Sequence, residues 1–355
     1  MLRRRACWGR VGRAEVVYRG CVDYLTGYGK HGVDVVRGLR RLGYAMDVQP
    51  SSVWEPWGFA LPADIRGNLV DWSAAPTELL LLPPPHAGLP GKRTVHYTMW
   101  ESSELLPEVV ANLNRQDELI LPCQWNADCF RACGVTVPIH VVPLYVDLDV
   151  YTPAPMAMDG PLVIGCGGRM AHGGIRKGIQ ECIDTFREAF PSERGVCLEV
   201  KIFPDCPLPG CSDPRVRIIR EPWSGPQMAR WYRNLTCYLS MALAEGFGLM
   251  PIQAMACGRP VVLTLAHGHL EYANASVAYP VEWRLEDCAA SLPGQSFYHG
   301  EWYRPSRVSA AEQLRSIYRD RETARAKGLA GAARALDFAP ERHVVRLAEI
   351  LFPSC

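Results

Sequence analysis

The 355-residue sequence has no apolar run long enough to cross a membrane. Its longest aliphatic run, at residues 79–82, ends in three prolines, whereas a transmembrane helix needs about 20 apolar residues. A secretory signal would need an unbroken apolar segment near the N-terminus, but Arg10 and Arg13 interrupt that region. The sequence therefore predicts a soluble, cytoplasmic protein.

The sequence also lacks an excess of charge of either sign. Lys and Arg number 38 against 37 Asp and Glu, which gives a formal net charge of +1. This balance excludes a strongly basic nucleic-acid binder, although not a local basic patch. Arginines do gather near the N-terminus, at positions 3, 4, 5, 10 and 13, so a nucleic-acid acceptor such as a modified base stays a minor alternative.

Among the 14 cysteines there is no C-x-x-C pair. Cys206 and Cys211 flank a Pro-Leu-Pro-Gly turn, but no matching second pair accompanies them. Both a zinc site and a disulfide framework are therefore disfavoured. We expect small buried thiols in a reducing compartment.

Short strand-like runs alternate with amphipathic helical stretches along the whole chain. Strands are predicted at residues 15–20, 45–48, 79–82, 94–98, 118–121 and 140–143, and again at 162–166, 198–203, 216–219, 238–241, 261–265 and 277–281. Such alternation indicates parallel sheets with right-handed crossovers. The predicted fold class is α/β, with two Rossmann-like domains that face each other across a cleft.

A proline-rich stretch at residues 153–161 separates the two predicted sheets. We therefore expect a first domain over residues 1–150 and a second over residues 151–335. Residues 336–355 are expected to form a last helix. That helix should pack back on the first domain.

Glycines occur at the carboxyl ends of predicted strands in both halves. Gly27, Tyr28 and Gly29 lie before a helix predicted over residues 32–42. Backbone amides in such a turn can approach a phosphate or a sugar. A simple strand–helix turn is an equally good interpretation of this segment by itself.

Basic residues follow the first strand of the second half. Gly168 and Arg169 end that strand, and Lys177 follows eight positions later. A forked guanidinium and a point-charge ammonium at the carboxyl end of a parallel strand suit a diphosphate. The alternative is a solvated basic loop.

An acid stands at the start of a third glycine segment. Glu245 precedes Gly246 and Gly248, and Pro251 suits the first turn of a helix. Gln253 would then point into the same pocket as Glu245. A purely structural corner would leave an acid beside bare amides unexplained, so we interpret this segment as a binding site.

The stretch from Glu245 to Gln253 resembles the E-x7-E signature of retaining glycosyltransferases with the GT-B fold, specifically family 4, the "group 1" glycosyltransferases. Other segments resemble that family in the same order along the chain, namely residues 96–102, 114–118, 142–147, 168–169, 176–178 and 254–261. The resemblance therefore covers most of the sequence.

The resemblance implies a catalytic group of four residues. Arg169 and Lys177 would hold the donor diphosphate, and Glu245 would contact the sugar hydroxyls. Glu101 would lie close to the reacting sugar. The donor would be a UDP-sugar or GDP-sugar, with no metal and no further cofactor.

The resemblance also implies that three segments bind the donor mainly through backbone. These are Gly27, Tyr28 and Gly29 from the first domain, Gly168 beside Arg169, and Gly246, Phe247, Gly248 and Leu249 before Gln253. Gln253 stands where the family has a glutamate that binds ribose. A glutamine oxygen still accepts a hydrogen bond but without charge assistance, so we expect weaker donor binding and not a dead enzyme.

Asp147-Leu148-Asp149 has the form of a metal-binding D-x-D motif. It lies in the predicted crossing between the domains, where we expect a structural turn. The aromatic residues Trp54, Trp57, Phe59 and Trp72 could form either a stacking surface or part of the core.

Two alternatives to a transferase remain. One is a nucleotide-sugar epimerase or a phosphorylase of the same fold, although a phosphorylase would be a much longer chain. The other is a nucleotide-sugar-binding protein that has lost catalysis. The sequence specifies neither the acceptor nor the oligomeric state.

Overall fold

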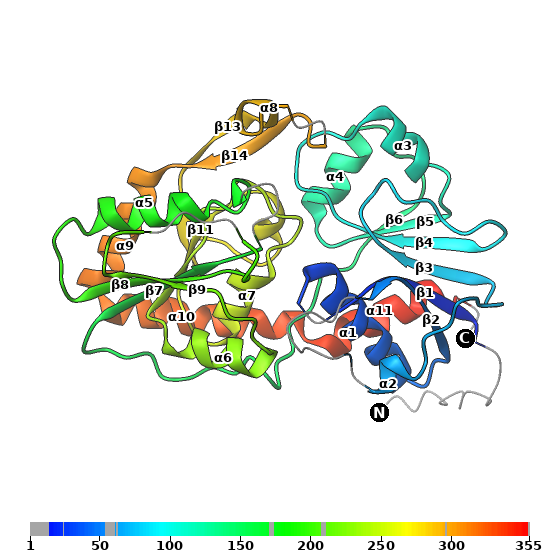
Figure 1. Ribbon diagram of the computed structural model, residues 1–355, viewed down its shortest axis with the longest axis horizontal. Coiled ribbons are helices and arrows are strands. Elements are labelled where there is room, and N and C mark those ends of the chain that lie inside the picture. Colours follow the sequence, from blue (N-terminus) through cyan, green and yellow to red (C-terminus); the bar gives the residue numbers. More distant parts are fainter. Residues whose placement is uncertain are drawn as a thin grey trace.

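The computed structural model describes residues 14–23, 25–53, 61, 63–169, 174–206, 211–294 and 297–353. Two six-stranded sheets lie in two adjoining α/β domains (Figure 1). Their strand orders are β2-β1-β3-β4-β5-β6 and β12-β11-β10-β7-β8-β9. The predicted class of two Rossmann-like domains with parallel sheets is confirmed.

The first sheet is built from strands whose neighbours all pair in parallel. They are β1 (Val16–Val22), β2 (Met46–Val53), β3 (Thr77–Leu81), β4 (Arg93–Tyr97), β5 (Glu118–Leu121) and β6 (Ile139–Val141). The intervening helices are α1 (Gly27–Arg41), α2 (Ala63–Arg66), α3 (Pro107–Leu113) and α4 (Gln124–Ala132). Its central strands β3 and β4 are buried except at their first residues, as expected where helices cover both faces of a parallel sheet.

The second sheet repeats this arrangement. Its strands are β7 (Leu162–Gly167), β8 (Val196–Lys201), β9 (Val216–Ile219), β10 (Cys237–Leu239), β11 (Val261–Thr264) and β12 (Tyr279–Val281). Its helices are α5 (Ile179–Ala189), α6 (Gly225–Asn234), α7 (Leu249–Ala256) and the 3-10 helix η3 (His267–Glu271). Each predicted strand of both halves is present; the largest difference is in β2, which extends to Val53 and not to residue 48.

An antiparallel ribbon after the second sheet was not predicted. It consists of β13 (Trp283–Asp287) and β14 (Glu301–Pro305), with the short helix α8 (Cys288–Ser291) between them. The residues of β13 are mostly exposed. The ribbon therefore shows none of the buried periodicity by which the other strands can be recognised.

The chain ends in α9 (Arg307–Arg319), α10 (Arg321–Ala335), η4 (Leu336–Phe338) and α11 (Pro340–Leu351). α11 lies beside α1 of the first domain (Figure 1). Its buried side chains, among them Val344 and Leu347, share one apolar cluster with the first sheet. A Cβ atom at Gly38 of α1 would lie 2.5 Å from a methyl group of Val344, so the two helices approach closely because that residue is glycine.

Within the described part of the chain, we find no helix with both the length and the apolar character needed to cross a bilayer. The side chain of Trp72 is exposed at 74%, so it does not belong to the core. Trp54, Trp57 and Phe59 lie outside the described residues.

Leu347 should anchor α11 to the first domain. It is fully buried, so Leu347→Ala should lower the free energy of unfolding by about 2–5 kcal/mol through lost burial and a residual cavity. Val345, on the opposite side of the same helix, is exposed, and Val345→Ala should leave stability nearly unchanged. Denaturant titration of both variants measures the difference; equal effects would contradict this packing.

Candidate functional site

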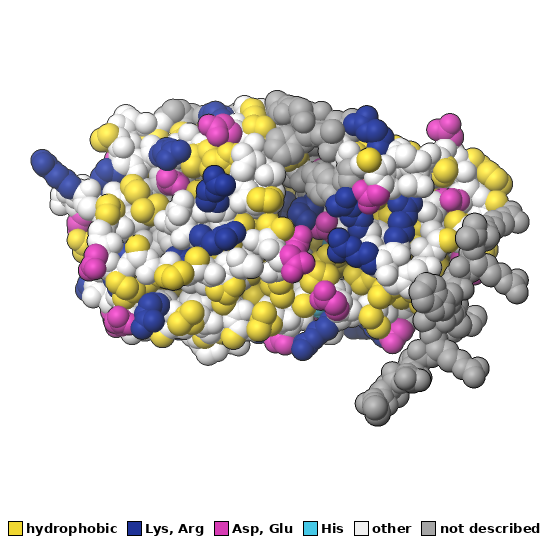
Figure 2. All heavy atoms as spheres, turned by 90° about the horizontal axis from the view of Figure 1, so that it is seen from below, with side chains coloured by type: hydrophobic (Ala, Val, Ile, Leu, Met, Phe, Trp, Pro, Cys, Tyr) yellow, Lys and Arg dark blue, Asp and Glu magenta, His cyan; other side chains and the backbone are white. Residues whose placement is uncertain are grey.

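A cavity of about 390 Å³ lies between the two domains. Residues from both domains line it, and they come mainly from segments that follow the carboxyl ends of β1, β4, β7 and β10. Seen from below, acidic and basic side chains lie next to one another near the junction of the domains (Figure 2). Ligands of open α/β sheets bind at such an edge.

The structure brings almost all of the predicted site residues to this one cavity. They are Gly27, Tyr28, Glu101, Gly168, Arg169, Lys177, Glu245, Gly246, Phe247, Gly248, Leu249 and Gln253. Gly29 is the exception, because it does not line the cavity. Its assignment as a donor contact therefore stays a prediction.

Gly29 has a structural reason to be glycine. Helix α1 begins at Gly27, five residues before its predicted start, so the glycines form its first turn. A Cβ atom at Gly29 would lie 1.9 Å from a carboxylate oxygen of Asp23. Asp23 in turn accepts hydrogen bonds from the Leu25 amide at 2.8 Å and from the Thr26 hydroxyl at 2.6 Å.

Gly27 behaves differently from Gly29. No atom lies within 4 Å of the position that its Cβ would occupy, and it lines the cavity together with Tyr28. The N-terminus of α1 is thus open to a ligand on this side. Free amides and the helix dipole favour a negatively charged group there.

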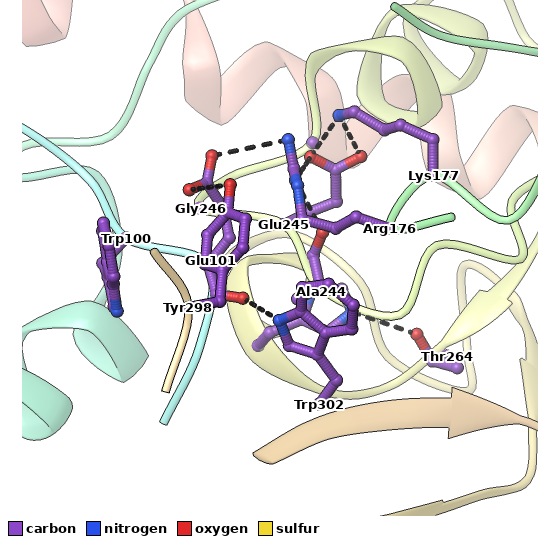
Figure 3. A network of polar contacts seen from close by, with 12 residues as sticks. Trp100, Glu101, Arg176, Lys177, Ala244, Glu245, Gly246, Thr264, Tyr298 and Trp302 are labelled. Atoms are coloured by element: carbon purple, nitrogen blue, oxygen red, sulfur yellow. Dashed lines mark hydrogen bonds and ion pairs between the residues drawn. The ribbon is translucent and has the colours of Figure 1, made fainter. Parts of the chain in front are cut away.

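The centre of the site is a cluster of two cations and two carboxylates (Figure 3). The ammonium of Lys177 donates to both carboxylate oxygens of Glu245, at 2.6 and 2.7 Å. The guanidinium of Arg176 lies 3.6 Å from Glu245 and 3.6 Å from Glu101. It also donates to the carbonyl of Ala244 at 2.9 Å.

Arg176 had been assigned no role from the sequence. The available signal was its place directly before Lys177. The structure puts its guanidinium between Glu101 of the first domain and Glu245 of the second. It therefore joins acidic residues that are 144 positions apart in the sequence.

Burial and charge compete in this cluster. Burial alone would raise the pKa of Glu245, but the charges of Lys177 and Arg176 outweigh it and hold that pKa below its ordinary value. Burial lowers the pKa of Lys177 in spite of the adjacent carboxylate. Glu245 is therefore ionised at neutral pH and can accept hydrogen bonds from a ligand.

Arg169 and Gly168 lie at the end of β7. Arg169 is exposed on the cavity wall, and its guanidinium lies 5.9 Å from the ring centre of Phe203. The stem of Lys177 packs against Gly168, where a Cβ atom would be 3.3 Å from it. A larger residue at position 168 would thus crowd the lysine.

Helix α7 begins at Leu249, so Pro251 lies in its first turn, as predicted. Gly248 precedes the helix with φ +91°, and a Cβ atom there would lie 2.8 Å from the Tyr272 hydroxyl. Gln253 lies in the second turn. Its side chain is buried and accepts a hydrogen bond from the Tyr232 hydroxyl at 3.3 Å.

Asp147 of the D-x-D sequence caps its own turn. Its carboxylate accepts hydrogen bonds from the amides of Asp149 at 3.1 Å and Val150 at 3.3 Å. In the described ranges, no group of three or more His, Cys, Asp and Glu side chains is arranged to hold a metal ion.

Residues 161–282 match the family described as Glycosyl transferases group 1. Over 156 residues the chain is 30% identical to LpcC, a lipopolysaccharide core biosynthesis mannosyltransferase from Rhizobium leguminosarum bv. viciae. That match covers 38% of this chain and 42% of the mannosyltransferase, which is less than half of the relative's length.

Solved structures are similar over nearly the whole chain. A sucrose-phosphate synthase from Thermosynechococcus elongatus superposes with a TM-score of 0.68 at 15% identity, over 97% of this chain and all of its own. WaaG, a glycosyltransferase involved in lipopolysaccharide biosynthesis, superposes with a TM-score of 0.65 at 12% identity. This superposition covers 95% of this chain and 99% of WaaG. These likenesses confirm the GT-B fold.

The charge cluster should make stability depend on pH. Glu245→Gln leaves Lys177 without its carboxylate, so it should lower the free energy of unfolding at neutral pH by roughly 1–3 kcal/mol. Because the folded-state pKa of Glu245 is depressed, its contribution is present above the unfolded value of about 4.3 and is lost as pH falls through the folded value.

The difference between wild type and Glu245→Gln should therefore shrink in acid. Denaturant titrations at neutral and acidic pH measure it. Glu312, an exposed glutamate of α9, provides the matched control Glu312→Gln. A difference that stays constant with pH would contradict the ion pair.

Proposed function

We propose that this chain is a glycosyltransferase that transfers a sugar from a nucleotide-diphosphate sugar to an acceptor hydroxyl, with retention of configuration. The match of residues 161–282 to the Glycosyl transferases group 1 model supports this proposal. The observation that carries the proposal is the interdomain cavity. It gathers a basic pair, two carboxylates and two helix N-termini from both domains. We place the enzyme in the cytoplasm.

The diphosphate would bind to Arg169, Lys177 and the amides at the starts of α1 and α7. The Lys177 ammonium has three N–H donors, and two of them form hydrogen bonds to Glu245. One donor therefore remains for a phosphate oxygen. Positive charge and amides would neutralise the diphosphate without a metal ion.

Catalysis would consist mainly in stabilising the leaving diphosphate by groups that are already in place. Ionised Glu245 would accept hydrogen bonds from the sugar hydroxyls and orient the ring. Glu101 would lie on the side of the reacting sugar. The acceptor hydroxyl would attack from the face that the diphosphate leaves, and a diphosphate oxygen would take its proton.

We propose a UDP-sugar or GDP-sugar as donor, with Gln253 at the ribose. The acceptor would be a hydroxyl of a glycan, a small molecule or, as a minor alternative, a modified nucleic-acid base. The relatives named above give no support to an epimerase.

Incubation of the protein with a panel of UDP- and GDP-sugars, with and without mixed acceptors, tests the proposal. Mass spectrometry should show a glycosylated acceptor, or slow hydrolysis of one donor when no acceptor is present. Activity should survive a chelator. If NMR shows an epimerised donor in an incubation without acceptor, the proposed transfer is contradicted. If every donor of the panel remains unchanged, the chain is a binding protein and not an enzyme.

The basic residues give one quantitative test. Arg169→Ala and Lys177→Ala should each lower kcat/KM for the donor by tenfold or more, since a hydrogen bond to a charged group is worth about 1.5–3 kcal/mol and a factor of ten corresponds to about 1.4 kcal/mol. Arg217 is an exposed arginine on β9, so Arg217→Ala serves as the control. Wild-type kinetics in both cavity variants would place the phosphates elsewhere.

Gln253 provides a second quantitative test of the proposed donor site. Contact with ribose barely changes during reaction, so Gln253→Leu should raise the donor KM by a factor that corresponds to about 0.5–1.5 kcal/mol and leave kcat nearly flat. Gln253→Glu should bind the donor at least as well as wild type. A collapse of kcat in Gln253→Leu would instead indicate a direct part in the chemistry.

The Gln253→Leu variant needs a control for stability, because it also removes the acceptor of the hydrogen bond from the Tyr232 hydroxyl. A buried hydroxyl without a partner costs about 1–3 kcal/mol of stability. The double variant Gln253→Leu/Tyr232→Phe should regain that stability. The raised donor KM should persist in it if ribose is the ligand.

A further inference from the structure

The β13–β14 ribbon belongs to the second domain but reaches over to the first (Figure 1). The Ser103 amide donates to the Glu301 carbonyl at 3.2 Å, and the Glu301 amide donates to the Ser103 hydroxyl at 2.8 Å. An isolated antiparallel bridge joins Glu104 and His299. The ribbon is thus held to residues 103–104 by backbone contacts and by the Ser103 hydroxyl.

Gly300 makes this close approach possible. Its φ is +75°, a conformation that favours glycine. A Cβ atom at this position would lie 2.4 Å from the Ser103 hydroxyl and 2.7 Å from Cγ of Glu104. Any larger residue would therefore push the ribbon away from the first domain.

Glu101 is held by the same ribbon at two points (Figure 3). The indole N–H of Trp302, a fully buried side chain, donates to the Glu101 carbonyl at 2.7 Å. The Tyr298 hydroxyl donates to the Glu101 carboxylate at 3.4 Å. The ring of Tyr298 packs on Trp100 with 5.3 Å between ring centres, which fixes the hydroxyl in place.

The two carboxylate oxygens of Glu101 therefore have different partners. One faces Arg176 at 3.6 Å, and the other accepts from Tyr298. Two contacts from different directions define the plane of a carboxylate, whereas one contact would let it turn. Both partners come from the second domain, while Glu101 itself follows β4 of the first.

We propose that residues 283–294 and 297–305 form a strap that fixes Glu101 in the cavity, and that Tyr298 is a positioning residue for the proposed sugar transfer, acting through the Glu101 carboxylate. The inference rests on the proposed function for its kinetic consequence. The strap's hold on residues 101–104 can be tested without it.

Tyr298→Phe keeps the ring that packs on Trp100 but removes the hydroxyl. Because the donor contacts lie on other segments, kcat should fall roughly tenfold, the size of a lost hydrogen bond to a charged group. The donor KM should stay close to wild type. A merely structural role would lower the unfolding midpoint and leave kcat unchanged.

Tyr303 supplies a matched control on the same ribbon. Its hydroxyl accepts a hydrogen bond from the Trp125 indole at 3.0 Å and so also bridges the domains. Tyr303→Phe removes an interdomain hydroxyl without touching Glu101. It should retain the wild-type kcat; an equal loss in both variants would overturn a specific role for Tyr298.

Hydrogen–deuterium exchange tests the strap independently of catalysis. Gly300→Ala should speed exchange of the Ser103 amide, and the milder Ser103→Ala should do the same for the Glu301 amide. Tyr298→Phe should change neither. If wild type transfers no sugar, the proposed function fails and the kinetic role fails with it; if exchange is unchanged in both strap variants, the strap fails.

Discussion

The arrangement of this site depends on the cost of keeping four charges in a cavity between two domains. Lys177 and Glu245 meet at hydrogen-bond distance, and Arg176 lies between two carboxylates. Removing a charge from water is expensive unless a partner and hydrogen bonds replace the lost hydration. Each charge here is therefore stable only because the others are present, and the cluster behaves as one unit.

Backbone geometry puts these charges together. Glu101 follows β4, Arg176 and Lys177 follow β7, and Glu245 follows β10. Parallel strands bring their carboxyl ends to one edge, and the two sheets turn those edges toward a shared cavity. The polar groups that would be costly in either core thus lie where a charged ligand can complete their hydrogen bonds.

The features that could be predicted from the sequence are those whose signals lie in neighbouring residues. The strands, α7 and the segment from Glu245 to Gln253 carry their information in consecutive residues, through apolar periodicity, glycine turns and helix-start signals. The contact between Gly29 and the Asp23 carboxylate, which gives this position a structural reason to be glycine, could not be predicted, because the spacing of residues does not reveal side-chain packing. The roles of Tyr298 and Trp302 could not be predicted, because these residues contact Glu101, which lies 197 and 201 positions away in the sequence.

The glutamine at position 253 can be understood from the same charge balance. In the function that we propose, a second glutamate would offer ribose a charge-assisted hydrogen bond, but it would also add a buried negative charge to the cavity that is to admit a diphosphate. Gln253 gives up the first effect and avoids the second. Its oxygen already accepts from Tyr232, so the amide is held in place without an ionic partner. A glutamine at this position therefore avoids the desolvation cost of a third acid and leaves the ion pair between Lys177 and Glu245 undisturbed.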